Sequence, residues 1–159
     1  MKFTKLILIA FVVSGAFYWE SCQAVGETGK RAESFVGKNW KMVEFTVSPA
    51  IDWDLDGSDD KDIFALLEPC DKDDFLLFRA DQSLIRVGGE VKCDEDEEPE
   101  KDDGTWQFDE RTKTLRMSKD GKTEESQLSD LTTDGMVLKH IFKSTDGKEH
   151  TLTAKYQVK

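Results

Sequence analysis

The cysteines are the residues of this chain with the most definite chemistry. Three are present, at Cys22, Cys70 and Cys93. An odd number in an exported chain leaves one thiol without a partner, so one cysteine can carry a covalent attachment while the other two form a disulfide. We therefore predict a Cys70–Cys93 disulfide and a separate role for Cys22. Two free buried thiols are the alternative for the pair.

Hairpin geometry supports this pairing. Facing residues of an antiparallel hairpin have a constant index sum, and facing Cys70 with Cys93 centres a tight turn between Asp81 and Gln82. A bridge at the far end of that hairpin would stabilise the fold by roughly 3 kcal/mol. The same register puts four apolar residues on one face, pairing Phe78 with Ile85 and Leu76 with Val87.

The first 21 residues are typical of an export signal. Lys2 and Lys5 precede an apolar stretch from Leu6 to Trp19, which is shorter than the roughly 20 residues that a spanning helix needs. Ser21-Cys22 resembles the end of a bacterial lipobox, in which the cysteine takes a diacylglyceryl group. We therefore predict a signal peptide over residues 1–21 and lipidation at Cys22.

Lipidation at Cys22 would anchor the mature protein in the cell envelope, at the outer membrane, through its N-terminal lipid alone. Residues 22–34 have the small, polar composition of a flexible tether. Trp19 and Glu20 depart from the lipobox, which has an aliphatic and a small residue there. A cut after Ala24 is the alternative, and it would release a soluble periplasmic protein.

A run of aspartates could bind a cation. The segment Asp52-x-Asp54-x-Asp56-Gly57-Ser58-x-Asp60 matches the ligand spacing and the tight-turn glycine of a calcium loop. Its twelfth position is Ile63, where a calcium loop has a bidentate glutamate. The prediction is calcium binding by Asp52, Asp54, Asp56 and Asp60, against a solvated acidic surface as the alternative.

The two histidines do not form a catalytic constellation. A hydrolase needs a nucleophile, a base and an orienting group, and the chain has only His140 and His150. We also find no zinc-ligand spacing and no glycine-rich phosphate loop. The sequence therefore predicts a protein without enzymatic activity and, calcium aside, without a cofactor. Both histidines are expected to be hydrogen-bonded residues of the core or rim; as ligand contacts, His140 and Tyr156 would put polar groups into an otherwise aromatic interior.

The net negative charge of the chain excludes some classes of binding partner. The formal net charge is −11, and removal of residues 1–22 takes away Lys2, Lys5 and Glu20, leaving 20 basic and 32 acidic groups, or −12. Such a surface repels phosphate backbones and anionic lipid headgroups, so nucleic acid is excluded as a partner. With 159 residues, 38% of them hydrophobic, the chain can form one core and is expected to be a monomer.

Short alternating segments must position these residues. Turn signals such as Asp120-Gly121 and Asp146-Gly147 separate eight candidate strands, which span 37–47, 73–80, 83–92, 104–109, 113–118, 122–129, 134–143 and 149–158. Apolar and polar residues alternate along these strands, so the sheet has one apolar and one solvent-exposed face. This favours an all-β, eight-stranded antiparallel up-and-down barrel, with a sandwich as the alternative. One short helix near 59–68, capped by Asp59 or Asp62, would lie across the barrel as a lid.

Several motifs resemble a known family. These are Gly37-Lys-Asn-Trp40, Cys70-Asp-Lys-Asp-Asp-Phe75 with Phe78 beyond it, Cys93, and Gly104-Thr-Trp106. Together they resemble the lipocalin-like domains of Bacteroidetes-type exported lipoproteins. The resemblance implies a lipocalin-like barrel over residues 35–159 and a lipid-anchored envelope protein, and it implies no enzyme activity.

A lipocalin-like barrel has an interior that holds side chains or one small ligand. We predict that the domain binds an apolar or amphipathic small molecule; filling of the interior by these side chains is the alternative. The loops between the first and second, third and fourth, fifth and sixth, and seventh and eighth predicted strands emerge at one end, the open mouth. The first two of them are strongly acidic, which suggests a second function, contact with another envelope protein. The side chains predicted to line the interior and contact the ligand are Trp40, Phe78, Trp106, Phe108, Met117, Leu138, His140, Phe142 and Tyr156.

Overall fold

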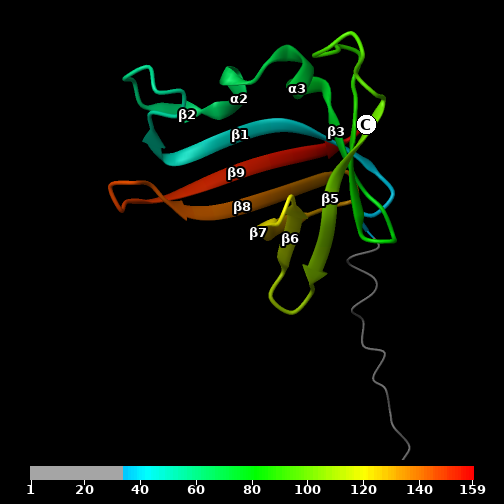
Figure 1. Cartoon of the computed structure of the whole chain (residues 1–159). Helices are drawn as coiled ribbons and strands as arrows, with labels where there is room; N and C mark the ends of the chain where they lie inside the picture. Colours follow the sequence, from blue (N-terminus) through cyan, green and yellow to red (C-terminus); the bar gives the residue numbers. More distant parts are fainter. Residues whose placement is uncertain (1–33) are drawn as a thin grey trace, which may run out of the picture.

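A computed structural model describes residues 34–159 (Figure 1). The predicted signal peptide, the lipidation site Cys22 and all of the predicted tether except Ser34 lie outside these residues. None of the helices in the described part of the chain is long and apolar enough to cross a membrane.

The described chain is a closed antiparallel barrel. All eight predicted strands are present, and a ninth strand, β2, is added to the free part of one edge of β1. The barrel closes because β1 pairs with β3 on one edge and with β9 on the other. The strands are β1 (Asn39–Ile51), β2 (Asp60–Asp62), β3 (Phe75–Phe78), β4 (Ser83–Val87), β5 (Glu100–Asp109), β6 (Thr114–Lys119), β7 (Lys122–Leu131), β8 (Gly135–Lys143) and β9 (Glu149–Val158).

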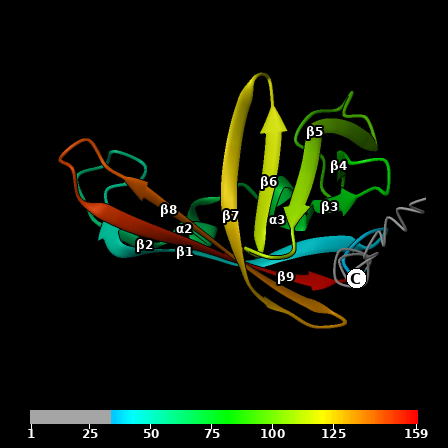
Figure 2. The same ribbon diagram turned by 90° about the horizontal axis from the view of Figure 1, so that it is seen from below.

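The strands form two sides of unequal length. β1, β9 and β8 lie side by side and extend well beyond the short β3 and β4 (Figure 1). Figure 2 shows the hairpin of β6 and β7 standing between these long strands and the side that holds β3, β4 and β5. The connections after β1, β4, β6 and β8 emerge at one end, which is the end predicted to be the mouth.

The predicted helix over 59–68 is partly wrong. Residues 60–62 pair with β1 as β2, and two short helices follow, α2 (Ile63–Leu66) and α3 (Pro69–Asp73). Asp62 is the N-cap of α2 and accepts a hydrogen bond from the Ala65 amide, as predicted for this position. Pro69 explains the interruption, because the residue before a proline is forced into extended backbone and Glu68 has ψ 152°.

The predicted register of the β3–β4 hairpin is wrong by one residue. Phe78 pairs with Leu84, not with Ile85, and Leu76 pairs with Arg86, not with Val87. A shift of one residue moves every side chain of a strand to the opposite face. β4 therefore presents Leu84 and Arg86, not Ile85 and Val87, on the face that Leu76 and Phe78 share.

Aromatic side chains close the end of the barrel opposite the mouth. Phe35 is fully buried, and its ring packs edge-on against three others, Phe78, Trp106 and Phe108, at centroid distances of 5.2–5.5 Å. The indole of Trp40 donates to the Phe35 carbonyl at 2.8 Å. This aromatic plug, formed by Phe35, Trp40, Phe78, Trp106 and Phe108, is the centre of the core.

Strand β5 begins four residues earlier than predicted, within a charged segment. Gly104 pairs with Leu84 and Asp102 pairs with Ile85, so Asp103 is left between them as a bulge. Gly104 has φ +104° and lies so close to β6 that an added Cβ would be 2.1 Å from the Ser118 carbonyl oxygen. Only glycine fits such a backbone, which explains why glycine stands at the first position of the Gly104-Thr-Trp106 motif.

Candidate functional site

Two cavities occupy the interior between the aromatic plug and the mouth. The outer cavity has a volume of about 620 Å³ and is lined by residues of the barrel wall, of the segment around α3 and of the β6–β7 turn. The inner cavity has a volume of about 390 Å³, lies along β1, β7, β8 and β9, and extends to Trp53 in the loop after β1; like the outer cavity, it is partly open to solvent. The two adjoin, because five residues line both: Met42, Phe45, Met117, Glu124 and Tyr156.

Six of the nine predicted lining residues face these cavities. Trp40 lines the outer one, Met117 and Tyr156 line both, and the inner cavity is lined by Leu138, His140 and Phe142. The other three, Phe78, Trp106 and Phe108, line neither cavity and pack in the aromatic plug. The prediction that these three side chains line the cavity is therefore wrong. They fill the narrow end of the barrel, as in the alternative in which side chains fill the interior.

Tyr156 is the most deeply buried polar side chain of the cavities. It is 6% exposed, and burial raises the pKa of its phenol to about 12. Its hydroxyl has no hydrogen-bond partner among the described residues, although a buried tyrosine hydroxyl usually has one. Ser126, 7% exposed on β7, likewise has no partner in that part of the chain. Both hydroxyls are thus available to a ligand.

A charged cluster lies in the outer cavity. The carboxylate of Asp103 is 12% exposed and pairs with Lys119 at 2.6 Å and with Arg86 at 3.5 Å. Arg86 also reaches Asp71 of α3 at 3.8 Å. Sequence reasoning missed Arg86, because the incorrect register of β4 placed this side chain on the outer face.

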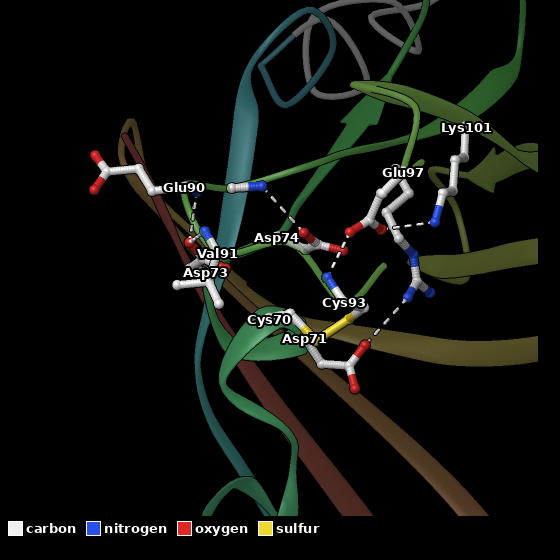
Figure 3. The surroundings of a disulfide bond; sticks show 11 residues. Cys70, Asp71, Asp73, Asp74, Glu90, Val91, Cys93, Glu97 and Lys101 are labelled. Carbon is white, nitrogen blue, oxygen red and sulfur yellow. Dashed lines mark hydrogen bonds and ion pairs between the residues drawn. A yellow bond between two sulfur atoms is a disulfide. The ribbon is translucent and has the colours of Figure 1, made fainter. Parts of the chain in front are cut away.

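The Cys70–Cys93 disulfide is confirmed, but not in the predicted place. It joins α3 to the β4–β5 loop, residues 88–99, with a Cα–Cα distance of 5.3 Å, and neither cysteine lies in the hairpin strands. Carboxylates next to Cys70 hold the same loop (Figure 3). Asp73 accepts from the amides of Glu90 and Val91 at 2.6 and 2.9 Å, and Asp74 accepts from the Gly89 amide at 3.1 Å.

The electrostatics of this loop follow from burial and pairing. Burial raises the pKa of Asp74, which also lines the outer cavity. Glu97 accepts from the ammonium of Lys101 and from the Cys93 amide, and these two donors lower the pKa of its carboxyl. The disulfide and these hydrogen bonds together fix one side of the mouth.

The histidines differ in their surroundings. His150 is 3% exposed, and its ring bonds the Pro49 carbonyl at 2.9 Å and the Ser144 hydroxyl at 3.0 Å. Both ring nitrogens are occupied, and His150 lines neither cavity. His140 lines the inner cavity, and its Nδ1 lies 2.7 Å from the Glu125 carbonyl oxygen. Since a carbonyl can only accept, Nδ1 donates, and Nε2 of the neutral ring is an acceptor.

The aspartate loop is compact. Carboxylate oxygens of Asp52, Asp54 and Asp60 lie within 4.8 Å of one another, and Asp52 Oδ1 is buried without a partner among the described residues. Asp56 does not join this group; its carboxylate accepts from the Ser58 amide at 2.8 Å. Trp53, within the loop, lines the inner cavity and packs edge-on against Phe45.

Comparison with known proteins identifies the barrel. The family model of the lipocalin-like domain matches residues 35–138, which is more than half of the chain. No curated protein matches the sequence. The matched region runs from the first residue of the aromatic plug into β8 and includes every motif that carried the resemblance. The chain therefore belongs to the family of lipocalin-like domains.

Proposed function

We propose that this protein is an exported, lipid-anchored binding protein for a small apolar or amphipathic molecule, and that it has no catalytic activity. One observation carries the proposal of binding: the inner cavity, which adjoins a second and more polar one, has a largely apolar wall, and the hydroxyl of the buried Tyr156 beside it has no partner among the described residues. Ligand pockets typically combine apolar walls with a few convergent polar groups. Lipocalin-like domains are typically binding domains without catalysis.

The size of the cavities supports a small-molecule ligand. Their volumes, about 620 and 390 Å³, fall within the roughly 300–1,000 Å³ range of pockets that bury a small organic molecule. The aromatic plug closes the end of the barrel opposite the mouth. A ligand would therefore enter from the mouth, between α3 and the β6–β7 turn.

Titration with Nile red, a neutral probe that fluoresces in apolar surroundings, tests this proposal. We expect saturable binding of one probe per chain. Leu152 lines the inner cavity, whereas Thr151 faces the other side of β9. Leu152→Trp should fill the cavity and weaken binding, and the matched Thr151→Trp should not. Absence of saturable binding, or equal loss in both variants, would contradict the proposal.

The proposal of export and lipidation rests on the N-terminal sequence and the disulfide. Lys2 and Lys5, the apolar stretch after them and Ser21-Cys22 favour a lipoprotein signal, and a Cys70–Cys93 bridge persists in an oxidising compartment such as the envelope. Intact mass of the protein purified from membranes, with and without reduction, tests this. We expect an acylated chain that begins at Cys22. A mature chain beginning at Val25 would refute the anchor.

Calcium binding by the aspartate loop is a second candidate function. The convergence of Asp52, Asp54 and Asp60, with a buried oxygen of Asp52 left unpartnered, favours it over a merely solvated acidic surface. Millimolar calcium should raise the melting temperature of the protein, and Asp54→Asn should abolish the rise. The neighbouring Asp59→Asn serves as the control. No response to calcium would contradict this function.

A further inference from the structure

The inner cavity has one charged side chain, and that side chain is acidic. Among the residues that line it, Glu124 is the one acid, and none is a lysine or an arginine. Glu124 pairs with Met117 across β6 and β7 and, by alternation, shares a face of β7 with the buried Ser126 and Leu128, although its own side chain is exposed. It lies where the two cavities adjoin. A ligand in either cavity would therefore meet this carboxylate.

Glu124 has no ion-pair or hydrogen-bond partner within residues 34–159, in contrast to its neighbour Glu125. Glu125 points to the opposite face and pairs with Arg116 at 2.6 Å. The bases near Glu124 are largely engaged elsewhere, because Arg86 and Lys119 both contact Asp103. Lys122, two residues before Glu124, lines only the outer cavity. An exposed carboxylate that lines both cavities and has no protein partner is suited to a cationic group of a ligand.

The other polar groups of the inner cavity can also accept hydrogen bonds. Tyr156 and Ser126 contribute hydroxyls without protein partners, and Nε2 of the neutral His140 ring is an acceptor. No lysine or arginine lines this cavity. An anionic ligand would thus face a carboxylate and no fixed positive charge in this cavity, which disfavours its binding there.

The surrounding rings favour a cation as well. Phe45, Trp53 and Phe142 line the inner cavity, and aromatic faces attract ammonium groups through the ring quadrupole. In the outer cavity, acids outnumber bases by five to three. The acids are Asp71, Asp74, Asp103, Asp120 and Glu124, and the bases are Arg86, Lys119 and Lys122.

We infer that the ligand is an apolar molecule bearing a protonated amine, whose ammonium group is held by the Glu124 carboxylate while its apolar body lies between the rings of the inner cavity. The inference rests on the proposed binding function and specifies its ligand class. Tyr156 and Ser126 act beside Glu124 as acceptors for the remaining N–H groups.

Three probes of equal chain length test the inference: decylamine, decanol and decanoate, each displacing Nile red from the full chain at neutral pH. The amine should bind about two- to fivefold more tightly than the alcohol, since the carboxylate is exposed to solvent. Decanoate should bind most weakly. Glu124→Gln should reduce the affinity of the amine to that of the alcohol and leave the alcohol unchanged. The matched control Glu125→Gln should alter none of the three.

The outcomes separate the two proposals. If the alcohol binds but the amine binds no better, or if decanoate binds as tightly as the amine, the inference fails while the binding function stands. Equal loss of all three probes in Glu124→Gln would also overturn it. If no probe binds the wild-type chain, both fail. Leu152→Trp should abolish amine binding; persistence there would mean that the amine adsorbs to the acidic surface, which overturns the inference.

Discussion

At the scale of single residues, the cavity combines few polar groups with an apolar wall. No hydrogen-bond or ion-pair partner within residues 34–159 contacts the side chains of Tyr156, Ser126 and Glu124. Burial also raises the pKa of Tyr156. Arg86, in contrast, is engaged by two carboxylates. The residues open to a ligand are therefore the hydroxyls and the unpaired acid.

Tyr156 should titrate at an unusually high pH. Burial raises its pKa to about 12, whereas the unfolded chain ionises near 10. Between those values the folded form holds the proton that the unfolded form has lost, so the free energy of unfolding falls as the pH rises, by about 3 kcal/mol in total. Phenolate absorbance of the chain without residues 1–21, which lacks Tyr18 and retains Tyr156 as its one tyrosine, measures this. A midpoint near 10 in the folded protein would contradict it.

Gly104 should be far less replaceable than a turn glycine. Gly104→Ala would place a Cβ 2.1 Å from a backbone oxygen at φ +104°, and we expect it to destabilise the fold by about 3 kcal/mol. Gly121→Ala meets no atom within 4 Å and should cost about 1 kcal/mol for its positive φ. Urea denaturation of both variants compares the two. Equal losses would argue against the close approach of β5 and β6.

The direction in which a side chain points is predictable from the sequence where apolar and polar residues alternate strictly, as in β8 and β9. Leu138, His140 and Phe142 alternate with outward residues, and all three line the inner cavity. Arg86 and Asp103 were not predictable in this way. A hairpin register wrong by one residue hid the first, and the second lies at a bulge in a segment whose charge is typical of a loop.

At the scale of elements, the disulfide and the loop carboxylates fix one side of the mouth. The pairing of Cys70 with Cys93 is predictable from cysteine count, but its geometry was not, because Cys70 lies in α3 before β3 begins and β4 ends at Val87, six residues before Cys93. Strand β2 could not be predicted either. Its three residues, Asp60 to Asp62, are all charged, and backbone pairing with β1 alone makes them a strand.

Removal of the disulfide should loosen the mouth more than the barrel. The double variant Cys70→Ser, Cys93→Ser opens a loop of sequence separation 23 and should lose about 3 kcal/mol of stability. Hydrogen exchange should accelerate in the 88–99 loop and α3 well before it does in the long β8–β9 pair. Uniform acceleration, or none, would contradict this role for the disulfide.

At the scale of the whole molecule, the barrel is filled at one end and hollow at the other. The large aromatic side chains gather with Phe35 at the closed end. Met42, Phe45 and Met117 leave adjoining cavities nearer the mouth. Sequence patterning predicts which residues point inward, but not which inward residues meet across the barrel. For that reason Phe78, Trp106 and Phe108 could not be distinguished from true cavity residues.

The central claim is that a small apolar molecule occupies these cavities, and the methionines report on it directly. Met42 and Met117 line both cavities, whereas Met136 is 1% exposed in the core. In a protein with isotope-labelled methionine methyl groups, titration with decanol should shift the Met42 and Met117 signals saturably and leave Met136 unchanged. Unchanged signals for Met42 and Met117, or equal shifts of all three, would contradict the claim.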